Sequence, residues 1–369
     1  MTVNKVKENS IRVKHGRINY KVIIGKELIS RIGSIYKSDS KRGILISDRR
    51  LKDSRKMALK GLRSSGWFVQ ELALEAGENI KSFDKIEVVL TAMLKAKLDR
   101  DSTVFALGGG SIGDMAGFVA SVYMRGIKWV GLPSSLLAQV DSCLGGKTAI
   151  NHPLSKNLIG SFHQPSLVLC DTELLRSLSV RELISGFGEI VKYALICDPK
   201  FYKILEKKSI ADLGVDQELM VYLIKHSLSL KANIVVSDEF DRKGLREILN
   251  FGHSFGHALE STTGFQKFQH GEAIIWGMRF ALAMSVVKEL ISSEKWKQID
   301  AFLKQIPVPS LPKIKPSTFF RAMQTDKKSS RGRIRMVLLK GVGKTTLARE
   351  ISEFELNSAF QLMLENNDV

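Results

Sequence analysis

The sequence predicts an α/β protein: a Rossmann-like N-terminal domain with a mostly parallel sheet, followed by a mainly α-helical C-terminal domain. Up to about residue 170, short apolar runs alternate with segments of helical period, and strands separated by helices imply crossover connections. From about Ser179 onward, long helical periodicity replaces this alternation. The length of 369 residues suits two domains, which we expect at residues 1–178 and 179–369.

The predicted elements follow from these patterns in chain order. Six apolar runs are the strand candidates: residues 20–24, 43–47, 67–72, 103–107, 128–132 and 166–170. Between them, residues 51–62 and 83–98 carry apolar side chains at i, i+3 and i+4, which is typical of helices that pack on a sheet. In the second half, prolines at 307, 309, 312 and 316 predict an irregular connection, and residues 334–339 predict a short late strand.

The composition is that of a globular chain, with 44% hydrophobic and 25% charged residues, and it excludes intrinsic disorder. Lysine and arginine outnumber the acidic residues by 56 to 38, which gives a formal charge of +18. Such a charge suits nucleic-acid binding, but the basic residues are spread along the chain, without an RRM signature or a Cys-Cys-His-His finger. A pocket for a small anionic metabolite and a dinucleotide favours the same residues, so charge alone leaves both readings open.

Other features of the sequence bear on its location. No apolar run reaches the roughly 18 residues of a membrane span, since Arg279 interrupts the longest candidate at residues 273–287. Residues 1–16 mix charged and apolar side chains, so we expect no secretory signal. The three cysteines, Cys143, Cys170 and Cys197, are too few and too scattered for a disulfide framework or a cysteine zinc site. We therefore expect a cytoplasmic protein without a membrane partner.

A glycine-rich turn, GGGSIGD at residues 108–114, lies between a strand candidate and the helical segment 115–122. A turn in this place presents backbone N–H groups and a helix N-terminus to a phosphate. Gly108, Gly110 and Gly113 satisfy the dinucleotide pattern G-x-G-x-x-G, but residues 128–135 hold no acidic partner for a ribose. The turn is therefore a candidate nucleotide site, and a tight turn that binds nothing is the alternative.

A second glycine-lysine string, GVGKTT at residues 341–346, resembles the end of a P-loop. A P-loop needs a further glycine five residues before Gly343, and Leu338 stands there. Because no βα unit remains downstream either, we do not expect ATP hydrolysis at this string.

Histidines and a carboxylate form a candidate metal site. His253 and His257 are four residues apart and share one face of a helix, which suits metal coordination or a ligand beside a proton-transfer group; His270 follows after a turn. Glu189 lies three residues before Lys192 among apolar neighbours. Glu189 with two histidines would make a three-ligand site with one open position, as in catalytic zinc. The alternatives are ordinary core or surface histidines and a surface ion pair.

Taken together, these motifs resemble the 3-dehydroquinate synthases, a family of zinc- and NAD-dependent cyclases of the shikimate pathway within the sugar phosphate cyclase superfamily. The resemblance covers most of the chain. Besides the turn, it includes residues 123–126, 132–142, 145–148, 156–160, 189–193, 249–260, 270–272 and 326–328. The chain departs from the family pattern at Ser134 and Ser135, where two threonines are usual, and at Cys143, where a small residue is common.

The resemblance implies a role for each matching residue. The ligands of Zn²⁺ or Co²⁺ would be Glu189, His253 and His270. NAD would contact Glu78, Lys81, Gly109, Gly110, Gly113, Asp114, Ser134, Ser135, Lys147, Lys156, Thr172 and Ser177. The catalytic residues would be His257, Lys192, Asp141 and Asn250, and the substrate would contact Arg125, Lys147, Asn157, Lys231, Arg246 and Lys328. Arg125 would reach into the site of a partner subunit, which implies a homodimer.

The resemblance also implies the reaction. The substrate would be 3-deoxy-D-arabino-heptulosonate 7-phosphate, whose carboxylate and phosphate need several fixed cations. Transient oxidation at C5 by NAD would acidify the C6 proton, phosphate would leave from C7, and reduction, ring opening and aldol closure would give 3-dehydroquinate. The metal would act as a Lewis acid at the C5 oxygen. The alternatives are another sugar phosphate cyclase and a metal-dependent polyol dehydrogenase, which share the glycine turn and the histidine site.

Overall fold

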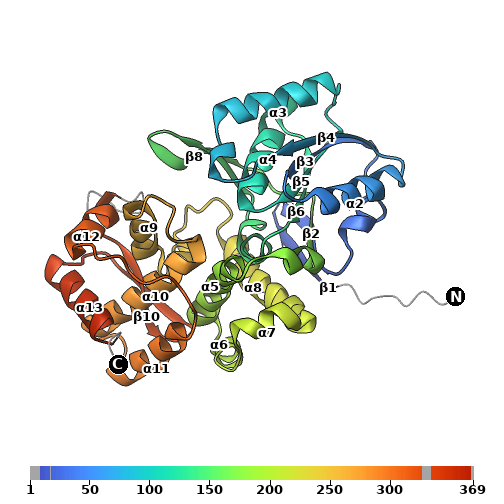
Figure 1. The fold of residues 1–369 in the computed structure, drawn as a ribbon. Coiled ribbons are helices and arrows are strands. Elements are labelled where there is room, and N and C mark those ends of the chain that lie inside the picture. Colours follow the sequence, from blue (N-terminus) through green and yellow to red (C-terminus); the bar gives the residue numbers. More distant parts are fainter. Residues whose placement is uncertain (1–8, 17, 326–333, 367–369) are drawn as a thin grey trace. The chain divides into compact units, whose positions relative to one another are not determined.

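The computed structural model describes residues 9–16, 18–325 and 334–366, and the chain divides into two compact units. The first comprises Met1–Leu178 and Asp216–Phe240, and the second comprises Ser179–Val215 and Asp241–Val369. The first unit is built on a mostly parallel sheet and the second is mainly helical, which confirms the predicted fold class (Figure 1). Residues 216–240 return to the first unit, so neither unit is one continuous stretch of chain.

A seven-stranded sheet forms the centre of the first unit, in the order β1-β2-β9-β6-β5-β3-β4. Its strands are β1 (Asn9–His15), β2 (Ile18–Gly25), β3 (Arg42–Asp48), β4 (Phe68–Leu74), β5 (Thr103–Gly108), β6 (Lys128–Pro133) and β9 (Leu167–Asp171). Neighbours pair in parallel except β1, which pairs antiparallel with β2 at one edge. All six predicted strands are present. The edge strand β1 and the separate hairpin of β7 (Lys147–His152) and β8 (Ser155–Phe162) were not predicted.

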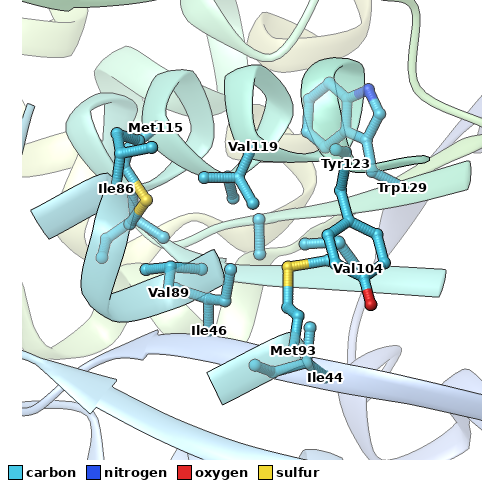
Figure 2. Packing of buried hydrophobic residues seen from close by; sticks show 14 of the residues in the cluster. Ile44, Ile46, Ile86, Val89, Met93, Val104, Met115, Val119, Tyr123 and Trp129 are labelled. Atoms are coloured by element: carbon cyan, nitrogen blue, oxygen red, sulfur yellow. The ribbon is translucent and has the colours of Figure 1, made fainter. Parts of the chain in front are cut away.

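Helices cover both faces of this sheet. They are α1 (Ile32–Ile35), α2 (Lys52–Arg63), α3 (Phe83–Lys95), α4 (Gly110–Val122) and α8 (Gln217–Ser237), with short turns of helix at η1 (Ile29–Arg31), η2 (Glu78–Ile80), η3 (Tyr123–Arg125), η4 (Ala138–Ser142) and η5 (Thr172–Ser177). Along β3, Ile44 and Ile46 pack with α3 and α4, whereas Leu45 packs on the opposite face with α2. Figure 2 shows the first of these cores, in which Val89 and Met93 of α3 meet Val119 of α4 over the sheet.

Helix α8 is long and apolar enough to cross a membrane by length and composition, with a mean hydropathy of 1.3 over its best window. In the structure it packs on β1 and β2, and half of that window is buried. The core helix of a globular unit passes the same test, so α8 is explained by its packing on the sheet.

The second unit packs around α10 (His270–Val287), which is buried on all sides from Gly271 to Ser285. Its other helices are α5 (Val180–Cys197), α6 (Pro199–Leu205), α7 (Ile210–Val215), η6 (Leu245–Asn250), α9 (His253–Thr262), α11 (Ser293–Lys304), α12 (Pro316–Thr325) and α13 (Glu353–Glu365). The one charge in the middle of α10, Arg279, is compensated by Asp300 of α11 at 2.7 Å.

The second glycine-lysine string forms the turn of a hairpin. Strands β10 (Met336–Gly341) and β11 (Lys344–Ala348) pair antiparallel across it, and the Gly343 N–H donates to the Leu195 carbonyl of α5. The string is followed by a strand rather than by the helix that a P-loop requires. The predicted late strand is present as β10.

Candidate functional site

The glycine turn joins β5 to α4 at the carboxyl end of the strand. Gly109 caps α4 and Gly110 is its first residue, so the free N–H groups of the helix begin inside the turn. Gly108 must lack a side chain, because a Cβ there would lie 2.6 Å from the Ile112 side chain. Gly113 has no neighbouring atom within 4 Å of the corresponding Cβ position. The turn therefore presents bare backbone donors at a helix N-terminus, the arrangement that binds phosphate.

A pocket opens beside this turn within the first unit. It is lined by Ala106, Gly108, Gly109, Gly110, Gly113, Asp114, Trp129, Gly131, Leu132, Pro133, Ala138, Ser142, Cys143, Gly146 and Lys147. Five residues of the predicted cofactor set are among them. Ser134 and Ser135 adjoin the same turn: the Ser134 N–H donates to the Gly108 carbonyl at 2.9 Å, and Ser135 Oγ lies 3.6 Å from the Cβ position of Gly109.

The turn stands where the connections between strands reverse direction. β3 leads through α2 to β4 on one side, whereas its neighbour β5 leads through α4 to β6 on the other. Ligands of open α/β sheets bind at such points, beyond the carboxyl ends of the strands. Asp48 ends β3 there, buried and 2.7 Å from Arg50. Sequence reasoning sought an acid about 20 residues after the turn and missed Asp48, because only the strand order brings it to this position.

Lys81 connects several segments beside the turn. Its buried ammonium lies 2.8 Å from Asp114 Oδ2 and 3.4 Å from Glu78 Oε1, and it donates to the side-chain carbonyl of Asn157 on β8. Burial raises the pKa of Asp114, and the Lys81 ammonium opposes that rise. The structure thus brings three predicted cofactor residues together with Asn157 of the predicted substrate set.

A second ion pair joins η4 to α8. Lys231 Nζ, on α8, lies 2.7 Å from Asp141 Oδ1 and 2.7 Å from the Asp141 carbonyl oxygen, although 90 residues separate them in sequence. The Gln139 side chain donates to the carbonyls of Pro133 and Asp171, and so ties η4 to the ends of β6 and β9. Asp141, predicted as catalytic, and Lys231, predicted as a substrate contact, are therefore held as one group.

Besides the residues already described beside the turn and on η4, four predicted residues of the first unit lie outside the lining of the pocket. Lys156 on β8 and Arg125 on η3 are exposed. Thr172 and Ser177 stand at the two ends of η5, where their hydroxyls donate to the carbonyls of Gly25 and Leu174. Both hydroxyls thus serve the local fold in this structure.

Three helices of the second unit bring the predicted metal ligands together. Glu189 stands on α5, His253 is the first residue of α9, and His270 is the first residue of α10. Glu189 Oε1 lies 3.6 Å from His253 Nε2 and 3.5 Å from His270 Nε2, and Glu189 is fully buried. One ligand atom from each residue lies within 4.8 Å of the other two.

This set of donors fits a zinc or cobalt ion. Two ligands bound to tetrahedral zinc at about 2.0–2.1 Å are themselves about 3.4 Å apart, close to the measured 3.5 and 3.6 Å. A carboxylate with two imidazoles leaves the fourth position open. His253 Nδ1 lies 3.1 Å from the Phe251 carbonyl, which assigns the proton to Nδ1 and leaves the Nε2 lone pair facing Glu189.

His270 has a carboxylate on each side. Its Nδ1 lies 3.3 Å from Glu260 Oε1 on α9. Burial disfavours the charged ring, but hydrogen bonds to Glu189 and Glu260 prevail and raise the pKa of His270 to about 10. A metal ion must therefore displace a proton here. His257 adjoins the set, with its ring centroid 5.3 Å from that of His253 and 6.1 Å from that of His270.

The remaining predicted residues of the second unit lie on α5, on η6 and beyond the described part of the chain. Lys192 is buried one turn after Glu189, and its ammonium pairs with Glu189 Oε2. Arg246, also buried, and Asn250 stand on η6. Lys328 lies outside the described residues.

Close packing of two helices sets the distance between Glu189 and His270. A Cβ on Gly271 would lie 1.9 Å from the Ser185 carbonyl oxygen of α5, and one on Gly188 would lie 2.7 Å from the Gly271 carbonyl oxygen. Only glycine lets the two backbones approach this closely. Sequence reasoning took Gly271 as part of a motif and did not foresee this contact.

Glu272 completes the explanation of the string His270-Gly271-Glu272. It is fully buried, accepts a hydrogen bond from the N–H of Gln269, the N-cap residue of α10, and lies 2.6 Å from Arg181 of α5. The string thus supplies a ligand, a close approach and a clamp between α5 and α10.

Comparisons with known proteins agree over both units. A family model described as "3-dehydroquinate synthase N-terminal" matches residues 71–185, and one described as "3-dehydroquinate synthase C-terminal" matches residues 186–329. A 3-dehydroquinate synthase of Thermodesulfovibrio yellowstonii is 39% identical over 351 residues, 94% of this chain and 98% of that protein. One of Bacillus cytotoxicus is 41% identical over 340 residues, 90% of this chain and 91% of that protein.

Solved structures share the fold. A 2-deoxy-scyllo-inosose synthase complexed with carbaglucose-6-phosphate, NAD⁺ and Co²⁺ has a TM-score of 0.87 at 24% identity, covering 97% of this chain and 100% of that one. A 2-epi-5-epi-valiolone synthase from Streptomyces hygroscopicus with NAD⁺ and Zn²⁺ bound has a TM-score of 0.85 at 23% identity, covering 95% and 98%. A glycerol dehydrogenase from Schizosaccharomyces pombe is more distant, with a TM-score of 0.62 at 15% identity, covering 97% and 93%.

Proposed function

The chain belongs to the 3-dehydroquinate synthase family, and from this premise we propose that it converts 3-deoxy-D-arabino-heptulosonate 7-phosphate into 3-dehydroquinate and phosphate. The observation that carries the proposal is the convergence of Glu189, His253 and His270 on one point, with ligand separations that suit a tetrahedral ion. When bound, NAD⁺ would accept and return a hydride, and Zn²⁺ or Co²⁺ would act as a Lewis acid.

We assign cofactor binding to the first unit. The bare N–H groups of the glycine turn and the N-terminus of α4 would hold the pyrophosphate. Lys81, fixed by Asp114 and Glu78, would add a positive charge beside it, and Asp48 at the end of β3 would accept from a ribose hydroxyl. Ser134, Ser135, Lys147 and Lys156 complete the proposed set, and Thr172 and Ser177 belong to it by family resemblance. The NAD⁺ in two structures of similar fold supports this assignment.

Buried cations would bind the two anionic groups of the substrate. Lys192, Lys231 and Arg246 are each at most 6% exposed, so their charges are poorly hydrated. Lys192 and Lys231 already pair with Glu189 and Asp141, and the anionic groups of the substrate would join these pairs. Lys147 lines the pocket of the first unit, and Arg125, Asn157 and Lys328 would contribute further contacts. Asp141 would orient Lys231, to which it is already bonded.

Proton transfer would fall to His257, which adjoins the proposed ligands without being one of them. Near pH 7 an imidazole can take up a proton in its neutral form and release one in its protonated form, in the range where the leaving phosphate changes its own protonation. Asn250 on η6 would hydrogen-bond the substrate and keep it in a conformation that can cyclise. We further propose a cytoplasmic homodimer in which the exposed Arg125 reaches the site of the partner subunit.

The test is an incubation with the heptulosonate phosphate, NAD⁺ and Zn²⁺. We expect release of inorganic phosphate and formation of a carbocyclic product, with no net NADH, because the hydride returns to the substrate. Steady accumulation of NADH would instead indicate a polyol dehydrogenase, and turnover of another sugar phosphate in its place would indicate another cyclase. Activity should vanish in His253→Ala and persist in His226→Ala, a histidine on α8 in the first unit.

A further inference from the structure

Two of the three cysteines, Cys143 and Cys170, lie together in the first unit. Cys143 directly follows η4, and Cys170 stands near the carboxyl end of β9, an interior strand of the sheet. Both thiols donate to one acceptor, the main-chain carbonyl of Gln139, with Sγ–O distances of 3.6 Å for Cys143 and 3.9 Å for Cys170. Because a single oxygen receives both, the two sulfur atoms are neighbours.

The two thiols differ in their access to solvent. Cys170 is fully buried, and burial raises the pKa of its thiol well above the ordinary value; a hydrogen bond with the Cys143 thiol adds to that rise. Cys143 is partly exposed and lines the pocket beside the glycine turn. An oxidant that enters the pocket therefore meets Cys143 first, and the Cys170 thiol is the neighbour of Cys143.

We propose that Cys143 is a site of reversible oxidation by hydrogen peroxide within the pocket, with Cys170 as its resolving thiol; the effect on the cofactor rests on the proposed function of that pocket. In the first step, peroxide transfers one oxygen to Cys143, giving a sulfenic acid and one water. In the second, the Cys170 sulfur displaces hydroxide from that sulfenic acid, and the hydroxide leaves as water with the Cys170 proton. Two thiols and one peroxide thus yield one disulfide and two waters.

The disulfide would act on the pocket through η4. A disulfide holds the two Cβ atoms about 3.5–4.5 Å apart, and it would fix the end of η4 to β9 in place of the two hydrogen bonds to the Gln139 carbonyl. Ser142, the residue before Cys143, lies against the turn, with its Oγ 3.1 Å from the Cβ position of Gly110. We expect NAD⁺ to bind about tenfold more weakly to the oxidised protein, as for one misplaced hydrogen bond.

The test uses the purified full-length chain, treated with hydrogen peroxide with and without NAD⁺. Free thiols are then alkylated, and the disulfide is mapped by peptide mass spectrometry. We expect a single intramolecular disulfide between Cys143 and Cys170, reversed by dithiothreitol and slowed by NAD⁺. Cys143→Ala and Cys170→Ala should each abolish it. Cys197→Ser, which removes the remaining cysteine in the second unit, should form it at the unchanged rate.

Other outcomes would overturn the proposal. A disulfide that includes Cys197, a disulfide between two chains, or oxidation of Cys143 that stops at the sulfenic or sulfinic acid with Cys170 intact would each refute the pairing. NAD⁺ affinity is measured separately by calorimetry on the reduced and oxidised protein. If the reduced chain fails to bind NAD⁺, the cofactor assignment is wrong. The disulfide map still tests the pairing of Cys143 with Cys170, because it does not depend on NAD⁺ binding.

Discussion

The substitution Gly271→Ala tests how the second unit holds its proposed metal ligands. The new Cβ would lie 1.9 Å from the Ser185 carbonyl oxygen, and real Cβ contacts essentially never fall below 3.0 Å. The backbones of α5 and α10 must therefore separate locally by about 1 Å, whereas metal sites hold their ligand distances within about 0.2 Å. Since Glu189 and His270 stand on these two helices, a separation of this size should displace one ligand from the other.

Two measurable losses follow. Overpacking of this kind costs about 1–3 kcal/mol, of which the better helix propensity of alanine recovers roughly 1 kcal/mol. Displacement of the ligands should weaken metal binding by about 10–100-fold, the range seen when the support of a ligand is disturbed.

Competition with a fluorescent chelator measures the affinity for Zn²⁺, and urea unfolding measures the stability. Gly214→Ala is the matched control, because no atom lies within 4 Å of its Cβ position on α7 of the same unit. We expect Gly214→Ala to keep the affinity of the unmodified chain. If Gly271→Ala also keeps that affinity, then close packing of α5 on α10 does not set the ligand geometry.

The remaining predictions concern the same unit. His253→Ala should lose both bound metal and activity, whereas His257→Ala should keep the metal and lose rate; equal metal loss in both, measured by elemental analysis, would reverse the assigned roles. Because the pKa of His270 is raised to about 10 in the metal-free protein, its proton competes with the ion throughout the neutral range. Zn²⁺ affinity should therefore rise about tenfold per pH unit below that pKa, and a flat profile in calorimetric titrations would contradict the assignment. Arg279→Ala should lower the unfolding free energy by about 3 kcal/mol, the low end for breaking a buried pair, because it leaves Asp300 buried with the Lys304 ammonium 3.8 Å away. Urea unfolding checks this value, and a loss below about 1 kcal/mol, the worth of an exposed pair, would refute it.

Complete burial makes some strands easy to predict from the sequence, although β4 was also predicted and is only partly buried. β3 and β5 read as continuous apolar runs because helices cover both of their faces. The hairpin of β7 and β8 has mostly exposed or partly exposed side chains, so its sequence shows no such run. Helix α8 can be read as a helix, but its assignment to the first unit depends on packing against β1 and β2, which no local pattern encodes.

The candidate site likewise contains some features that the sequence predicts and others that only the folded structure shows. Chemistry marks glutamate and histidine as candidate ligands, but the choice of Glu189, His253 and His270 rests on the family resemblance, and the structure brings these three together. The contact of Gly271 with Ser185 depends on how closely two backbones approach, and the position of Asp48 depends on the order of strands. Both are properties of the folded chain rather than of any short segment.

The return of residues 216–240 to the first unit governs how that unit can be made. During synthesis α8 can cover the sheet only after residues 179–215 have left the ribosome, because it follows them in the sequence. A fragment cut at residue 178 would expose the surface of β1 and β2 that α8 covers and would lack the cation that binds Asp141. A fragment that contains the whole first unit needs Asp216–Phe240 joined to residue 178 by a short linker. The gene for such a fragment must therefore be designed from the topology of the unit, because its two segments are not contiguous in the sequence.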